Sequence, residues 1–148
     1  MNDILSTQLG AIAAMFSKAR EIGSRGVALA CIMPAKSAGQ SGQQMNPSII
    51  IVDRFQREPY SDSGDNGTNY LAVVMSKFAE MMDTHQNSGT TMGLTPKKGE
   101  LNLIGGIVEK SGDSLIFAAF SGGAPNDDVA VAWAGIEELR KFRPFDYS

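Results

Sequence analysis

The residues best suited to bind a ligand lie where an apolar strand gives way to a helix near the C-terminus. Ser121-Gly122-Gly123 ends the strand, and Asn126-Asp127-Asp128 opens the helix. Backbone N–H groups at such a turn can bind a carboxylate or a phosphate. Asp127 and Asp128 can equally supply the negative charge that this helix end favours. The pattern therefore predicts either a small-anion site or a tight, self-capped turn. The G-x-x-x-x-G-K-[ST] spacing of a phosphate loop is absent.

Two further residues stand at the ends of predicted elements. Asp53 follows an apolar strand, where its carboxylate can bind a ligand or pair with Arg54 or Arg57. His85 is the only histidine and lies seven residues after Phe78, so it continues an apolar helix face. It could ligate a haem iron, act as an acid or base, or face the last helix carbonyls. The predicted ligand-binding set is Asp53, His85, Ser121, Gly122, Gly123 and Asp127.

Other reactive side chains are expected to play structural parts. Lys77 is predicted to be solvated, because its neighbour Phe78 takes the apolar position. Cys31 lies in an apolar strand and is expected to be an inert core thiol. One cysteine and one histidine cannot build a closed zinc site, so no metal site is predicted unless His85 binds haem. No nucleophile elbow is present, and the catalytic residues, if any, stay unknown.

These residues must be positioned by seven elements, which the periodicity places as follows. Helices are predicted over 3–22, from Thr68 or Asn69 to about Gln86, and over 126–142, with strands at 26–33, 48–55, 100–109 and 114–120. Both strand pairs read as hairpins. The fold class is therefore α+β: one domain over 1–148, with a mainly antiparallel sheet of four to five strands flanked by three helices on both faces.

The same patterns give a predicted core and predicted lids. The side chains expected to be buried are Phe16, Leu71, Phe78, Trp133 and Ile136. The polar connections 35–46 and 56–68 are the natural lids of a site formed by Ser121–Gly123, Asp53 and the end of the helix that carries His85.

Composition restricts the partners. The formal net charge of −3 argues against nucleic acid, and no apolar run approaches the ~18 residues that cross a membrane. A single cysteine and an N-terminus without a basic region favour a cytoplasmic protein. The apolar stripes of the helices offer more surface than one sheet face covers, which predicts a homo-oligomer.

The C-terminal motifs resemble those of the GlcG/HbpS-like family. Leu103-Ile104-Gly105-Gly106-Ile107-Val108, a turn, Leu115 to Gly123 and the acidic pair Asp127-Asp128 occur in the order seen in that family. The strand with Val52-Asp53 and the helix with Lys77 match the family more loosely. Val108 stands near the position of the family's proline after Gly-Gly, and the family's Arg-Met-Asp-Gly-Ala stretch is replaced by Arg57-Glu58-Pro59-Tyr60 and a polar loop.

The resemblance implies a profilin-like fold and a small-molecule ligand. Family members bind haem or are associated with corrinoids, so the implied ligand is haem, another tetrapyrrole or a small organic acid. The alternative is a small metal-independent enzyme that acts on a catabolic metabolite. Haem is thus a possible cofactor, and the resemblance also implies a homo-oligomer.

Overall fold

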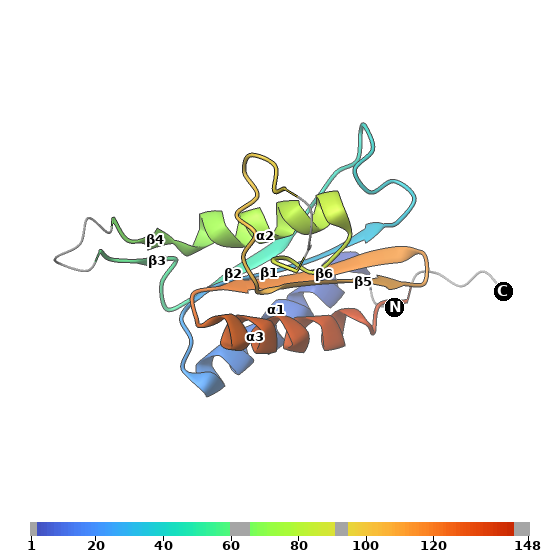
Figure 1. Ribbon diagram of the computed structural model, residues 1–148. Coiled ribbons are helices and arrows are strands. Elements are labelled where there is room, and N and C mark those ends of the chain that lie inside the picture. The colour runs from blue at the N-terminus through green and yellow to red at the C-terminus, as the bar shows by residue number, and fades with distance from the viewer. Residues whose placement is uncertain (1–2, 60–65, 91–94, 144–148) are drawn as a thin grey trace.

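The computed structural model describes residues 3–59, 66–90 and 95–143 (Figure 1). Three helices and six strands follow one another in this part of the chain. In order they are α1 (Ile4–Ile22), β1 (Gly26–Pro34), β2 (Ser48–Val52), β3 (Gln56–Arg57), β4 (Thr68–Asn69), α2 (Tyr70–Thr84), β5 (Gly106–Ser111), β6 (Ser114–Ser121) and α3 (Pro125–Leu139).

The main sheet is antiparallel throughout and has the order β2-β1-β6-β5. β1 pairs with β2 from Gly26 opposite Val52, and with β6 from Val27 opposite Ser121. The predicted α+β class, with three helices and a four-stranded antiparallel sheet, is confirmed. The register brings the start of β1, the end of β2 and the end of β6 to one end of the sheet.

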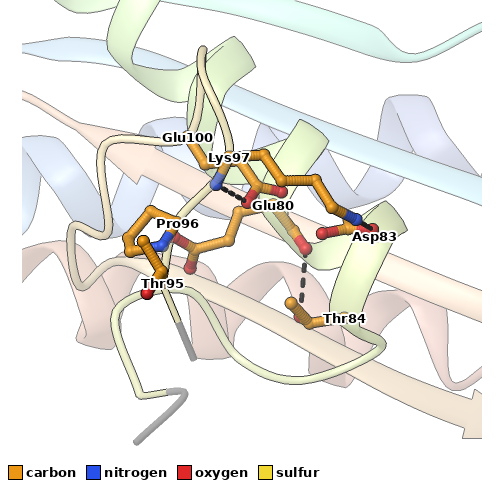
Figure 2. A pocket seen from close by; sticks show the side chains of 7 residues that line it. All are labelled: Glu80, Asp83, Thr84, Thr95, Pro96, Lys97 and Glu100. Atoms are coloured by element: carbon orange, nitrogen blue, oxygen red, sulfur yellow. Dashed lines mark hydrogen bonds and ion pairs between the residues drawn. The ribbon is translucent and has the colours of Figure 1, made fainter. Parts of the chain in front are cut away.

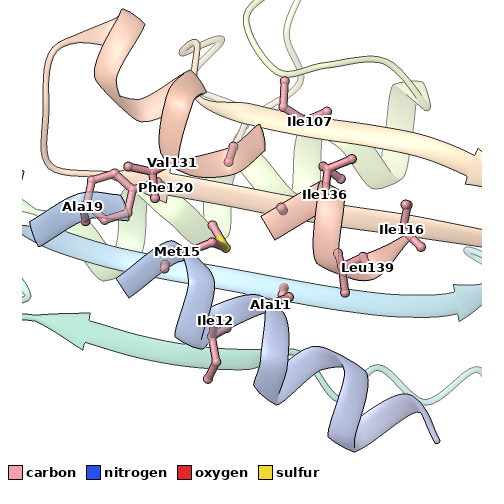
Figure 3. Packing of buried hydrophobic residues seen from close by; sticks show 14 of the residues in the cluster. Ala11, Ile12, Met15, Ala19, Ile107, Ile116, Phe120, Val131, Ile136 and Leu139 are labelled. Carbon is pink, nitrogen blue, oxygen red and sulfur yellow. The ribbon is translucent and has the colours of Figure 1, made fainter. Parts of the chain in front are cut away.

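Helices cover both faces of the sheet, as predicted: α1 and α3 lie on one face and α2 on the other (Figure 1). Alternate side chains of β1 and β6 point to opposite faces, because successive residues of a strand alternate. Ala28, Ala30, Ala118 and Phe120 therefore join Met15 and Ile136 in one apolar cluster. Figure 3 shows Met15, Phe120 and Ile136 of this cluster. Leu29 and Phe117 pack with Phe78 in the other, where the two phenylalanine rings meet edge to face.

Local signals fix the helix ends much as the sequence predicts. The Asp3 side chain accepts a hydrogen bond from the Ser6 N–H, and Gly23 ends α1 in the left-handed conformation. Asn69 caps α2 by accepting from the Ala72 N–H. α2 ends at Thr84, two residues before the predicted Gln86, because His85 turns left-handed with a φ of 55°.

Several strand limits differ from the prediction. β2 ends at Val52 instead of residue 55, because Asp53 has a φ of 66° and the Arg54 N–H bonds back to the Val52 carbonyl. The strand predicted to begin at residue 100 begins at Gly106. The predicted lid at 56–68 contains the short β3–β4 hairpin, and its residues 60–65, including Tyr60, lie outside the described residues.

The predicted core is confirmed at Phe78 and Ile136, and Phe16 is partly buried. It is wrong at Trp133, which is 37% exposed, and at Leu71, which is 38% exposed. α3 turns Val131, Ala132, Ile136 and Leu139 inward, so Trp133 lies at the edge of the buried face with its ring under the Arg140 guanidinium. Leu71 lies on the flank of α2.

Cys31 is free and buried, and burial raises the pKa of its thiol to about 11. The expectation of a core thiol is thus confirmed. In the described ranges, none of the helices has the length and apolar character needed to cross a bilayer.

Candidate functional site

A buried ion pair joins α2 to the start of α3. The Lys77 ammonium donates hydrogen bonds to Asp128 Oδ2 at 3.1 Å and to the Phe120 carbonyl at 2.7 Å. The other Asp128 oxygen accepts from the Gly123 N–H at 2.8 Å. Lys77 is 3% exposed and Asp128 5%, so the prediction of a solvated Lys77 is wrong. The pair fixes the turn that carries Ser121, Gly122 and Gly123.

The Gly105-Gly106 motif makes room for this network. A Cβ at Gly105 would overlap the Lys77 ammonium, and its φ of 134° disfavours side chains. A Cβ at Gly106 would lie 2.7 Å from the Met81 methyl carbon. The double glycine therefore lets α2 approach the sheet closely enough for Lys77 to reach Asp128.

Sequence reasoning missed Lys77, although a signal was present. Lys77 follows Val74 by three residues and precedes Met81 by four, and both of these are buried. Residues at those spacings share one helix face. The sequence prediction placed Phe78 on the buried face and Lys77 in solvent, but both side chains lie on the buried side of α2.

Burial also changes the protonation of this pair. Removal from water raises the pKa of Asp128 from 3.8 to about 6, against the opposing effects of Lys77 and the Gly123 N–H. Removal from water likewise lowers the pKa of Lys77, and Asp128 opposes this change. The folded state thus holds the Asp128 proton more tightly than the unfolded chain does.

We expect this shift to make stability depend on pH. Between about pH 4 and pH 6 the Asp128 contribution to the free energy of unfolding should fall as pH rises, because folding then opposes loss of the proton. Urea unfolding of the protein and of Asp128→Asn tests this. The stability of the variant relative to the original should rise by on the order of 2 kcal/mol from pH 4 to pH 7. Asp127→Asn is the matched control. A stability of Asp128→Asn, relative to the original protein, that stays constant or falls from pH 4 to pH 7 would contradict the expectation.

An open polar cavity of about 370 Å³ lies directly outside this pair. Gly123 separates the two: its N–H bonds to Asp128, while its outer side lines the cavity. The walls come from the end of α1 and its connection to β1, from the segment after β2, and from the β6–α3 turn with the start of α3. They are Ile22, Gly23, Ser24, Arg25, Arg54, Gly122, Gly123 and Asp127. Residues from three distant parts of the chain thus meet at one end of the sheet.

Charged groups of both signs surround the cavity. Arg25 Nε lies 3.5 Å from Asp53 Oδ2 in an exposed ion pair. Arg54 forms no ion pair with any described residue. Asp128 is already paired with Lys77, so its charge is balanced inside the protein. The cavity therefore offers one unpaired guanidinium, one shared guanidinium and the Asp127 carboxylate.

The structure brings together most, but not all, of the residues predicted for the site. Gly122, Gly123 and Asp127 line the cavity, and Asp53 stands at its rim through Arg25. Ser121 is buried in β6 and is 3% exposed. His85 does not line this cavity but stands at the C-terminal end of α2, where its backbone N–H bonds to the Met81 carbonyl. Ser24, Arg25 and Arg54 were not predicted.

The arrangement does not fit a haem ligated by His85. The His85 side chain is exposed at the helix end, whereas a haem needs an apolar slot beside its axial ligand. The cavity that holds the predicted glycines has Ile22 as its one large apolar residue. The predicted nitrogen ligand and the predicted pocket are therefore separate.

A second, smaller cavity of about 130 Å³ lies between α2 and the segment that precedes β5 (Figure 2). Glu80 is buried there and accepts a hydrogen bond from the Gly89 N–H at 2.6 Å. Lys97 bridges to Asp83 at the rim, and the Lys97 N–H bonds to Glu100. Across residues 3–59, 66–90 and 95–143, no group of three His, Cys, Asp or Glu side chains is arranged to hold a metal ion. The bonds from Gly89 to Glu80 and from Lys97 to Asp83 hold the segment before β5 against α2.

Comparison with known proteins identifies the fold. No family model matches the sequence, and no curated protein matches it. Among solved structures, the chain is similar to the crystal structure of the Klebsiella pneumoniae protein ORFY, which is assigned to the family model DUF336. The two chains are 14% identical, the match covers 95% of this chain and 92% of that chain, and the TM-score is 0.62. This chain therefore has the fold of the ORFY protein over nearly its whole length.

Proposed function

We propose that this protein is a small-ligand-binding protein of the GlcG/HbpS-like type, and that its ligand is a small organic acid. DUF336 is the GlcG-like family, so the shared fold supports the family resemblance of the C-terminal motifs. The observation that carries the choice of ligand is the polar cavity with Arg25 and Arg54 on its wall. Guanidinium groups bind carboxylates by paired, charge-assisted hydrogen bonds.

Asp127 refines the ligand class. It is the acidic residue on the cavity wall, and its carboxylate would repel a second carboxylate of the ligand placed beside it. A hydroxyl group on the ligand can donate a hydrogen bond to this carboxylate while the acid group binds Arg54. A small hydroxy acid therefore suits the cavity better than haem or another tetrapyrrole. The alternative, an enzyme acting on an organic metabolite, would use Asp127 as its acid–base group.

The test uses malate and succinate, which differ by one hydroxyl group. Backbone NMR shifts should move at residues 22–25, 54 and 122–127 when malate is added, with weaker binding of succinate. Arg54→Gln should weaken both acids by about 10-fold, because a charge-assisted contact is lost. Asp127→Asn should reduce the preference for malate. Lys98→Gln, at an exposed lysine outside the cavity, is the control.

Two results would overturn this proposal. One is the absence of shifts at these residues with about 10 mM of either acid, a concentration that detects even weak binding. The other is a Soret band on addition of haem that is lost in His85→Ala, which would restore the tetrapyrrole hypothesis.

We also propose that the protein is a cytoplasmic homo-oligomer. The single buried cysteine supports the compartment. The exposed apolar side chains of α1, β2 and α2 support self-association.

A further inference from the structure

We propose that two copies of this chain associate through β2, which pairs antiparallel with β2 of the second copy about a two-fold axis near Ile50. The two four-stranded sheets would then form one continuous sheet. The inference rests on the proposed homo-oligomer and names its surface, and it is independent of the ligand in the cavity.

β2 is an edge strand that carries no charge and no proline within its five residues, although Pro47 and Asp53 flank it. It stands at one end of the sheet order, so within residues 3–59, 66–90 and 95–143 one side of its backbone faces no other strand of this sheet. Its sequence Ser-Ile-Ile-Ile-Val contains no charge, and Ile51 is 50% exposed. Natural edge strands that must stay free are guarded by charges, prolines or bulges. β2 therefore has the character of a strand that pairs.

The opposite edge provides an internal comparison. β5 carries Glu109 and Lys110, and Arg140 of α3 holds the Glu109 carboxylate through two hydrogen bonds. Charges of this kind oppose the addition of another strand. One edge of the sheet is thus guarded, and the other is apolar.

On the α2 face, exposed apolar side chains flank the β2 edge. Ile49 and Ile51 share a face, since they are two residues apart, and Leu71 and Met75 are exposed on α2. The other flank of α2 is covered by the segment between α2 and β5. The Ser76 hydroxyl bonds to Gly99 and Leu101 of this segment, and Glu80 bonds to its Gly89. Leu71 and Met75 therefore lie on the flank that looks toward β2.

The opposite face repeats this arrangement. The Gln8 amide of α1 donates to the Asn46 carbonyl and to Ser48 Oγ, so α1 lies over the start of β2. The side of α1 with Ser6 and Gly10 lines a hollow shared with α3. Leu5 and Leu9 are exposed on the other side, toward the sheet edge. Apolar side chains thus surround β2 on both faces of the sheet.

A second copy is the occupant that matches this surface. A single added peptide strand would cover the backbone of β2 but leave the flanks of α1 and α2 in water. A two-fold axis brings the same flanks of the partner against them, as an isologous interface requires. Pairing about Ile50 sets Ile49 opposite Ile51 of the other copy, and β-branched pairs of this kind stabilise sheets. No like charges within β2 face each other.

Hydrogen exchange of the unaltered protein tests the surface directly. At about 100 µM, amides of residues 48–52 should exchange more slowly than at about 1 µM, while those of residues 106–111 should not change. Sedimentation should give twice the chain mass of 15.8 kDa at the higher concentration. A monomer at both concentrations would overturn the homo-oligomer and its surface together. An oligomer without protection of residues 48–52 would overturn the surface alone.

Matched variants sharpen the test. Ile51→Lys should raise the dissociation constant by about 100-fold or more, because a charge enters the apolar edge. Leu101→Lys, at a leucine that is 53% exposed beyond the other flank of α2, should leave it unchanged. If Ile51→Lys remains a dimer with the original affinity, the proposal is wrong. Malate binding to the Ile51→Lys monomer would report on the cavity separately.

Discussion

Replacing Lys77 with methionine is expected to destabilise the protein by about 3–5 kcal/mol. The buried Asp128 loses its cation, so it must either stay charged away from water or take up a proton, since its pKa then rises further. Methionine has a similar length, so little packing is lost. Asp128 keeps the Gly123 N–H as a partner, which compensates its charge only in part. The free energy of unfolding, measured with urea at pH 7, gives the effect.

Two further variants separate charge from packing. In Lys77→Met combined with Asp128→Asn, the buried charge is gone, so the double variant should be more stable than Lys77→Met alone. Lys98→Met, at an exposed lysine, should change stability by no more than about 0.5 kcal/mol. If Lys77→Met changed stability as little as Lys98→Met does, the ion pair would not hold α2 and α3 to the turn as described.

Replacing Gly122 with alanine is expected to lower the free energy of unfolding by at least about 3 kcal/mol. An added Cβ would overlap the Arg25 carbonyl oxygen, which belongs to the chain entering β1, and Gly122 has a φ of 141°. Gly26 stands in the same relation to the Ser121 carbonyl. The two glycines thus allow the backbones of β1 and β6 to approach at the end of the sheet.

Gly112→Ala is the control for this prediction. Gly112 also has a positive φ, 60°, but open space surrounds the position of its missing Cβ. Its substitution should therefore cost only about 1 kcal/mol, the conformational penalty alone. Thermal unfolding of both variants measures the difference. Equal losses in the two variants would mean that contact with the Arg25 carbonyl does not set the cost at Gly122.

The close approach at Gly122 also changes how the Ser-Gly-Gly motif is understood. The glycine-rich turn predicts that some group comes near the backbone, and a ligand was one candidate. At Gly122 the group is the neighbouring strand. At Gly123 the N–H bonds to Asp128, which agrees with the alternative of a self-capped turn. The ligand hypothesis now depends on the cavity outside these glycines and on Arg54.

The sequence by itself determined the seven main elements and the two hairpin pairings, β1 with β2 and β5 with β6, but not the central pairing of β1 with β6. Asp3, Gly23 and Asn69 mark helix ends through bonds to residues a few positions away, and the turn at 111–113 sets β5 beside β6. Such signals are local, so they can be read along the chain. An apolar period of 3.6 or an unbroken apolar run likewise showed which segments must be covered, and hence the α+β class.

Only the tertiary structure decided where the charged residues lie. Lys77 and Asp128 are fifty-one positions apart, and burying either one is favourable only when the other meets it. Arg25, Arg54 and Gly123 line one cavity because the register of β1 with β2 and β6 brings the start of β1 and the ends of β2 and β6 together. His85 does not line the cavity, because it lies at the C-terminal end of α2, eight residues beyond the Lys77 that reaches Asp128. Contacts between distant segments leave no periodic trace in a sequence, since their energy depends on which groups meet after folding.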